Sequence, residues 1–221
     1  VDDTTRNDEE FLPGGDRGWT AGRYHKKISA ISRAIAAAGE WELPSLIGLC
    51  EVENCEVVMD LAFGDLLSAG QYGVVHRDSP DLRGIDVALM YRKDHFTIAE
   101  VRSWVPLRPD NDPFLSRNLL YAKAVMDCDT LHLIVCHFPS RRGGVLATQG
   151  AREEMTQLLR VKTDSLLAVN ADGAIIVMGD FNAGPDDEIM KNLTCGGLLV
   201  NVSGRLSSGE KGTYRYQGQW E

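Results

Sequence analysis

Three apolar runs of the sequence each end in a polar residue of a type used in catalysis. LIGLC (46–50) is followed by Glu51, LHLIVC (131–136) by His137, and IIVMG (175–179) by Asp180. Short apolar runs of this length are typical of buried strands. In α/β sheets, ligand sites gather at the carboxyl ends of strands, where polar side chains leave a rigid base. The recurrence therefore predicts one site built from these three side chains.

The rest of the pattern predicts a single α/β domain over residues 1–221, beginning with a polar loop at 1–19. Helices are expected from the Thr20 cap to Gly39, from the Asn54 cap to Leu66, and over 148–169 and 185–193. Strands are expected at 46–50, 72–76, 85–91, 96–107, 119–127, 131–138, 174–180, 198–202 and 212–217. This order predicts mixed β-structure covered by helices, and no repeat or linker divides the chain.

Composition narrows the function further. The net charge of −9, from 32 acidic and 23 basic residues, is against a protein that simply coats nucleic acid. It does not exclude a phosphate substrate that metal ions and a few arginines neutralise locally. No apolar run approaches the roughly 20 residues that span a bilayer. We expect a soluble monomer without a stable protein partner. Both a bacterial cytoplasmic location and an exported one are left open.

The five cysteines show no CxxC spacing, and their odd number is against a complete disulfide framework. Most of them lie in or beside apolar runs, which predicts buried free thiols. They are Cys50, Cys55, Cys128, Cys136 and Cys195.

Each candidate site residue also has a purely structural interpretation. Asp180 and Asn182 in GDFNAGP could form an Asx turn that closes a strand, helped by the Gly-Pro pair that follows. Glu51 and Glu53 could supply oxygen ligands to Mg²⁺, but Glu53 also suits a helix N-terminus, where negative charge is favoured. His137 could cap a strand before a solvated loop, HFPSRRGG (137–144).

Taken together, these residue types favour metal-assisted hydrolysis of a phosphate ester. A carboxylate can hold a metal ion, a second can orient water, and histidine, asparagine and arginine can meet developing negative charge. The sequence contains no Gly-x-Ser-x-Gly elbow, Walker loop or dinucleotide fingerprint that would favour another reaction. The remaining histidines form no HExxH pair, which is against a zinc protease.

The ordered motifs LIGLCEVEN, RGIDVALMY, HFPSRRGG and VMGDFNAGPDD resemble the endonuclease/exonuclease/phosphatase superfamily, in a deoxyribonuclease-like bacterial branch of unassigned substrate. The resemblance runs from about residue 45 to the end of the sequence. It implies a four-layer α/β sandwich, in which two mixed sheets pack face to face with helices outside. It also implies Mg²⁺ as the cofactor, with Mn²⁺ or Ca²⁺ as alternatives, and a phosphate-ester substrate such as nucleic acid, a phospholipid headgroup or an inositol phosphate.

The same resemblance assigns roles to residues. Glu51 matches the family's metal-binding glutamate, and His137 the histidine that contacts or protonates the scissile phosphate. Asp180 matches the aspartate that orients or deprotonates water, and Asn182 the asparagine that helps to hold the phosphate. Candidate substrate-phosphate contacts are Arg117, which resembles an arginine of the deoxyribonucleases, and Arg83, Ser140 and Arg142, which are chosen from position and charge.

Two elements of the family pattern are not found in the sequence. The family begins with a core strand ending in asparagine and finishes with an Asp-His pair, whereas this sequence stops at Gln219-Trp220-Glu221. We expect a piece of a longer protein that is itself inactive, because catalytic groups act as a unit. The alternatives are a binding domain that retains the fold without catalysis, and an esterase directed at lipid or inositol phosphates.

Overall fold

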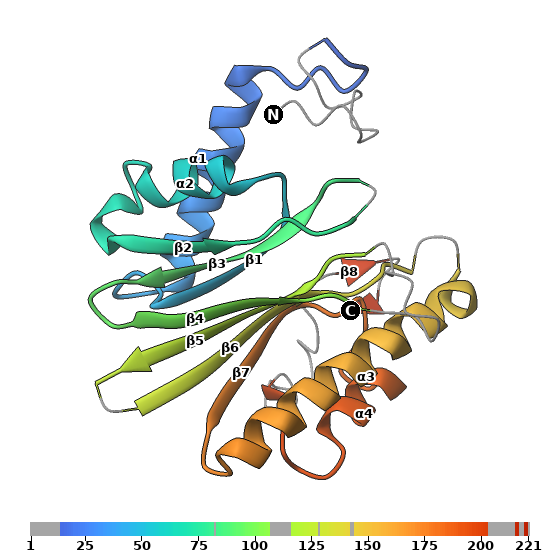
Figure 1. The fold of residues 1–221 in the computed structure, drawn as a ribbon. Coiled ribbons are helices and arrows are strands. Elements are labelled where there is room, and N and C mark those ends of the chain that lie inside the picture. Colours follow the sequence, from blue (N-terminus) through green and yellow to red (C-terminus); the bar gives the residue numbers. More distant parts are fainter. Residues whose placement is uncertain are drawn as a thin grey trace.

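The computed structural model describes residues 14–81, 83–106, 116–127, 129–141 and 144–202, together with two short strands, β8 (Arg215–Tyr216) and β9 (Gln219–Trp220). Its elements form four layers (Figure 1). Helices α1 (Ala21–Ala38) and α2 (Cys55–Phe63) cover a first sheet, and helices α3 (Val145–Val169) and α4 (Glu188–Thr194) cover a second. The four-layer α/β sandwich predicted by the resemblance is therefore confirmed.

The first sheet has the order β1-β3-β2, from β1 (Leu46–Val52), β3 (Asp86–Arg92) and β2 (Tyr72–His76). Its described pairs are antiparallel, so the mixed character predicted for both sheets is found only in the second one within the described residues. The second sheet has the order β4-β5-β6-β7, from β4 (Thr97–Trp104), β5 (Leu119–Met126), β6 (Asp129–His137) and β7 (Ala174–Asp180). It is mixed, because β6 and β7 run parallel and are joined through α3.

Alternating side chains of the strands build three packed regions. Along β5, Leu120 and Ala122 face the space between the sheets, whereas Leu119 and Tyr121 face α3 and α4. Both sides of this strand are covered, which explains its almost continuous apolar sequence. A third region packs α1 and α2 against the outer face of the first sheet. The two sheets approach closely at Gly48, where an added Cβ would lie 2.8 Å from the Sδ of Met178.

The predicted starts of the first two helices are confirmed. The Thr20 hydroxyl accepts a hydrogen bond from the Arg23 backbone N–H at 3.4 Å, and the Asn54 side chain accepts one from the Val57 N–H at 3.0 Å. Both are N-cap contacts that satisfy a backbone donor without an intrahelical partner. Among the described residues, no helix is both long enough and apolar enough to cross a membrane.

Several predicted boundaries differ from the structure. Residues 198–202, expected as a strand, form no strand and leave Leu198, Val200 and Val202 exposed, because the described chain gives them no sheet partner. Helix α2 ends at Phe63 rather than Leu66, and β4 ends at Trp104 rather than at 107. Of the expected strand 212–217 the structure describes the two-residue β8, and most of the expected loop 1–19 lies outside the described residues.

The cysteines follow the prediction only in part. Cys136 is buried, Cys50 and Cys55 are half-buried, and Cys195 is exposed, so burial was wrong for the last of these. These four thiols are free, as expected, whereas Cys128 lies outside the described residues.

Candidate active site

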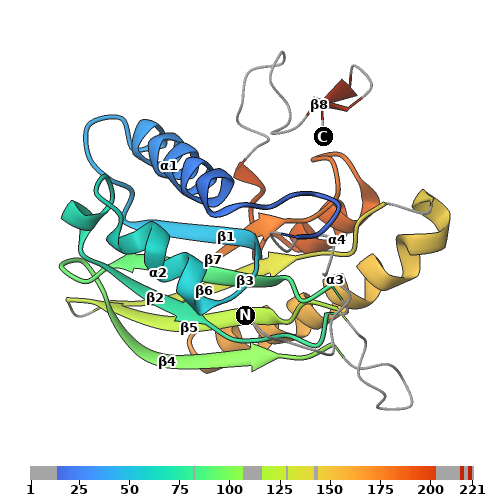
Figure 2. The same ribbon diagram turned by 90° about the horizontal axis from the view of Figure 1, so that it is seen from above.

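The structure brings together the strand ends that carry the predicted site. Strands β6 and β7 are aligned so that His137 lies opposite Asp180, and the backbone N–H of Phe138 donates to the Asp180 carbonyl at 2.8 Å. The thiol of Cys50, directly before Glu51, lies 3.5 Å from the carbonyl oxygen of Cys136, directly before His137. Figure 2 shows β1 running over β6 and β7, so the ends of all three strands meet.

Glu51 is presented by an irregularity in β1. The pairing register with β3 shifts between Cys50 and Val52, so Glu51 is the extra residue of a β-bulge. Its φ of 58° lies in the left-handed region, which is uncommon for a residue with a side chain. Bulges of this kind re-aim a side chain next to active sites. Here the bulge leaves the Glu51 carboxylate exposed, as an oxygen ligand for a hard cation must be.

Asp180 and Asn182 form the Asx turn that the sequence allowed. One carboxylate oxygen of Asp180, Oδ1, accepts from the backbone N–H of Asn182 at 2.8 Å, and Asn182 has a left-handed φ of 48°. The Asn182 amide Nδ2 donates to the Phe138 carbonyl at 3.0 Å. The second oxygen of Asp180, Oδ2, lies 3.8 Å from His137 Nε2, and the carboxylate remains 54% exposed. The turn thus holds the pair while leaving one carboxylate oxygen facing the histidine.

His137 is almost completely buried, at 2% exposure. Burial lowers the pKa of its imidazole to about 4, and the positive charges of Arg117 and Arg83 add to this effect, although Asp180 and Asp81 oppose it. At neutral pH the side chain is therefore uncharged. Its Nδ1 is buried and has no hydrogen-bond partner in the described part of the chain. A neutral histidine can donate a hydrogen bond to a phosphate oxygen, but it does not carry a proton ready for transfer.

The lowered pKa of His137 predicts a loss of stability in mild acid. The unfolded chain binds this proton near pH 6.5 and the folded chain only near pH 4, so the free energy of unfolding should fall as pH drops through that window. The difference corresponds to about 3 kcal/mol at pH 4. Urea unfolding between pH 8 and pH 4 should show this extra loss in the parent but not in His137→Gln. If the free energy of unfolding fell equally with pH in the two proteins, the pKa of His137 would not be lowered in the folded chain.

Arg117, predicted as a phosphate contact, is a buried ion-pair partner. Its exposure is 4%, one Nη donates to the Asp81 carboxylate at 3.0 Å, and the other donates to the Phe138 carbonyl at 3.1 Å. Asp81 also accepts from the Arg83 backbone N–H at 2.9 Å, while the Arg83 side chain remains half exposed. Arg83 is therefore the more accessible of the two cations. Whether either binds phosphate stays a prediction.

The loop after His137 is fastened by Arg141. Its Nε donates to the Asn182 carbonyl at 2.9 Å, and its guanidinium forms an ion pair with Asp187. The same Asp187 carboxylate accepts from the Gly184 N–H at 2.6 Å, which joins both loops beside Asp180. Ser140 lies half-buried in this loop, and the predicted Arg142 lies outside the described residues.

Asp81 and Arg141 are the site residues that the sequence did not indicate. Asp81 lies 36 positions from Arg117, and Arg141 lies 46 positions from Asp187, so no local spacing links either pair. For Arg117, the available signal was the need of a buried arginine for an acidic partner. With 32 acidic residues in the sequence to choose from, that signal does not name the partner.

The model of the Endonuclease/Exonuclease/phosphatase family matches residues 1–221. A search of curated protein sequences gives no match.

Solved structures share the fold at low sequence identity. A humanized TDP2 from D. rerio is 21% identical with a TM-score of 0.55, and the alignment covers 81% of this chain and 63% of that one. The mannosyl-6-phosphatase of Bacteroides thetaiotaomicron is 15% identical with a TM-score of 0.58, covering 77% and 61%. The human Nocturnin catalytic domain is 19% identical with a TM-score of 0.56, covering 79% and 63%. The chain thus spans less than two thirds of each of these proteins.

Proposed function

The chain belongs to the Endonuclease/Exonuclease/phosphatase family, and from this premise we propose that the protein hydrolyses a phosphate ester with the help of a divalent metal ion. The observation that carries the proposal is the alignment of His137 with Asp180 beside the end of β1, where the bulge exposes Glu51. A candidate metal ligand, a candidate proton acceptor and a candidate hydrogen-bond donor would thus act at one place. No other described feature accounts for an exposed carboxylate on strained backbone there.

The residues present fit a hard cation. Mg²⁺ commonly binds through one or two carboxylates and keeps several waters, and Glu51 offers one exposed carboxylate. Mn²⁺ or Ca²⁺ would be held by the same kind of ligand. When bound, the ion would supply positive charge that polarises a phosphate oxygen.

Asp180, Asn182 and His137 would perform the chemical steps that the metal ion does not. The Asp180 oxygen that is not used in the Asx turn can accept the proton of an attacking water. Asn182 has a second amide hydrogen besides the one given to Phe138, and a phosphate oxygen can accept it. His137 starts neutral and donates a hydrogen bond. An approaching phosphate anion would raise the pKa of this histidine and so favour its charged form.

The substrate is not chosen by these residues. The structural neighbours include a TDP2 complexed with a single-strand DNA product and a sugar phosphatase by name. A fold hosts different substrates through the loops around the site. We therefore propose the reaction class, and treat DNA, sphingomyelin and inositol phosphates as the substrates to compare.

Glu51→Gln tests the proposal. The intact gene product should hydrolyse a generic phosphodiester with Mg²⁺ and lose the activity in EDTA. The variant should lower kcat/KM by about 100-fold or more, because it removes the ligand charge. Glu153→Gln, an exposed glutamate of α3, is the matched control and should change little. Equal rates for Glu51→Gln and the parent would sink the metal assignment, and substrate binding without any hydrolysis would favour the binding-domain alternative.

A further inference from the structure

A second group of metal-binding residue types lies away from Glu51. His76 ends β2, Asp78 follows in the connecting loop, and Asp86 begins β3. Their neighbours Val75 and Val87 face the other sheet, so alternation along the strands places His76 and Asp86 on the opposite face, with Ala88 and α2. The group is thus separated from the space between the sheets.

Asp86 fixes the protonation of the histidine. It is completely buried, and its Oδ1 accepts from the Ser79 backbone N–H at 2.8 Å and the Ser79 hydroxyl at 2.6 Å. Its Oδ2 lies 3.2 Å from His76 Nε2. A buried carboxylate needs a donor for each oxygen, so Nε2 carries the hydrogen. In a neutral imidazole the other nitrogen, Nδ1, is then an acceptor.

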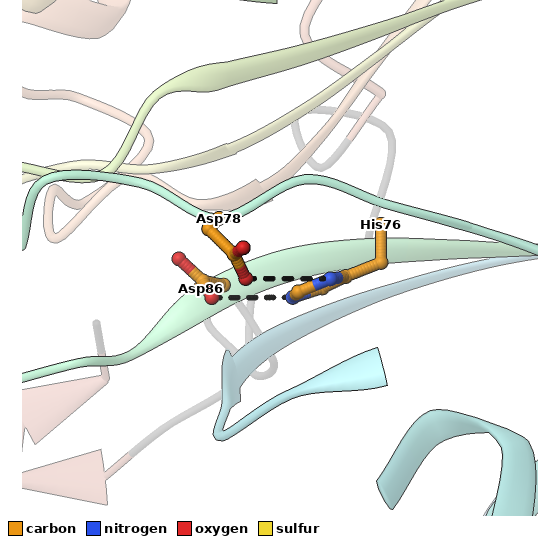
Figure 3. A group of neighbouring side chains, drawn as sticks. All are labelled: His76, Asp78 and Asp86. Carbon is orange, nitrogen blue, oxygen red and sulfur yellow. Dashed lines mark hydrogen bonds and ion pairs between the residues drawn. The ribbon is translucent and has the colours of Figure 1, made fainter. Parts of the chain in front are cut away.

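That acceptor faces a second carboxylate across a gap. His76 Nδ1 lies 4.0 Å from Asp78 Oδ1, which is too far for a hydrogen bond. Within the described ranges Nδ1 has no hydrogen-bond partner, although the His76 side chain is only 5% exposed. Figure 3 shows both carboxylates approaching the same edge of the ring. Two acceptors that face each other in this way repel unless a proton or a metal ion lies between them.

We propose that this gap binds a divalent cation of the Zn²⁺ class, with His76 Nδ1 and Asp78 as ligands and water completing the shell. Zn–N and Zn–O bonds are each about 2.0–2.2 Å, so together they fit a separation near 4 Å. Bending toward a tetrahedral angle requires movement of Asp78, whose side chain is 82% exposed. The bond from Nε2 to Asp86 is the orientation that metal-ligating histidines receive from an outer carboxylate.

The ligand types separate this site from the proposed magnesium site. An imidazole nitrogen suits Zn²⁺, whereas Mg²⁺ prefers oxygen ligands. The bound ion would fasten the loop between β2 and β3, which carries Asp81 and Arg83 toward Arg117. The proposal is independent of the proposed hydrolytic activity, since it rests on contacts at the other face of the sheet.

Calorimetric titration of the full chain with Zn²⁺, in millimolar Mg²⁺, tests the site. Asp78→Asn removes a ligand charge from an exposed position and should weaken one binding event about 10-fold or more. His25→Ala removes an exposed histidine of α1 and should leave that event unchanged. Equal Zn²⁺ affinity in Asp78→Asn and the parent would overturn the proposal.

Nitrogen NMR of the His76 ring measures the chemical shifts of the two ring nitrogens, which a loss of stability alone would not change. Without metal, the ring should carry a hydrogen on Nε2, and shifting the Nδ1 resonance should require about 10-fold more Zn²⁺ in Asp78→Asn than in the parent. A ring protonated on both nitrogens at pH 8, with no response to Zn²⁺, would show that the gap holds a proton instead and would reject the metal site.

Discussion

Asp180→Asn is expected to lower kcat for phosphodiester hydrolysis by the intact protein by about 10²–10⁴-fold, the usual range for loss of a general base. The asparagine side-chain oxygen can still accept the Asn182 N–H, so the Asx turn should persist. What disappears is the charged oxygen that faces His137. We expect KM to change much less than kcat, which steady-state kinetics would measure.

Asp186→Asn is the matched control for this change. Asp186 is an exposed carboxylate in the turn after the GDFN motif, so its replacement should leave kcat within about twofold, as is usual for surface positions. Thermal unfolding of both variants would separate lost chemistry from lost structure. Full activity in Asp180→Asn would remove this residue from the proposed mechanism.

Gly179→Ala is expected to destabilise the fold by about 3–5 kcal/mol, through backbone strain and overpacking together. Gly179 has a φ of +138°, which side chains rarely adopt. A Cβ at this position would lie 1.8 Å from the Cys136 carbonyl oxygen on the neighbouring strand. Because the clash involves backbone on both sides, no rotamer change relieves it. Urea unfolding should therefore show a lower midpoint or no folded state.

Gly150→Ala provides a control with the opposite sign. Gly150 lies within α3, and an added Cβ meets nothing within 4 Å. Alanine is favoured over glycine in a helix by up to about 1 kcal/mol, so this variant should be as stable as the parent or slightly more stable. Similar unfolding midpoints for the two variants would mean that the close contact at Gly179 has been misjudged.

The strands were predictable where local sequence and tertiary packing agree. Residues 72–76 and 174–180 form strands with the expected bounds, because apolar or β-branched runs there end at clear turn residues. The apolar run 198–202 carries a similar pattern, yet it forms no strand in the described structure. A strand needs a partner for its backbone, and a local pattern does not say whether one exists.

The site was predictable as a set of strand ends but not as a set of contacts. The sequence indicated Glu51, His137, Asp180 and Asn182, and the structure brings their strand ends together. The sequence did not indicate the bulge that turns Glu51 outward, since a register shift depends on the strand with which β1 pairs. The sequence also predicted a phosphate contact for Arg117, which stays a prediction, but it did not indicate the ion pair of that arginine with Asp81.

The Phe138 carbonyl receives hydrogen bonds from both Asn182 and Arg117. Two side chains, one just before β5 and one just after β7, are thus aligned by one backbone oxygen. Removing either donor changes the environment of the other, so their free-energy contributions are coupled rather than independent. The sum of two single-substitution effects at these positions will therefore misstate the effect of the double substitution, and the size of that discrepancy measures how strongly the two sides of the site are connected.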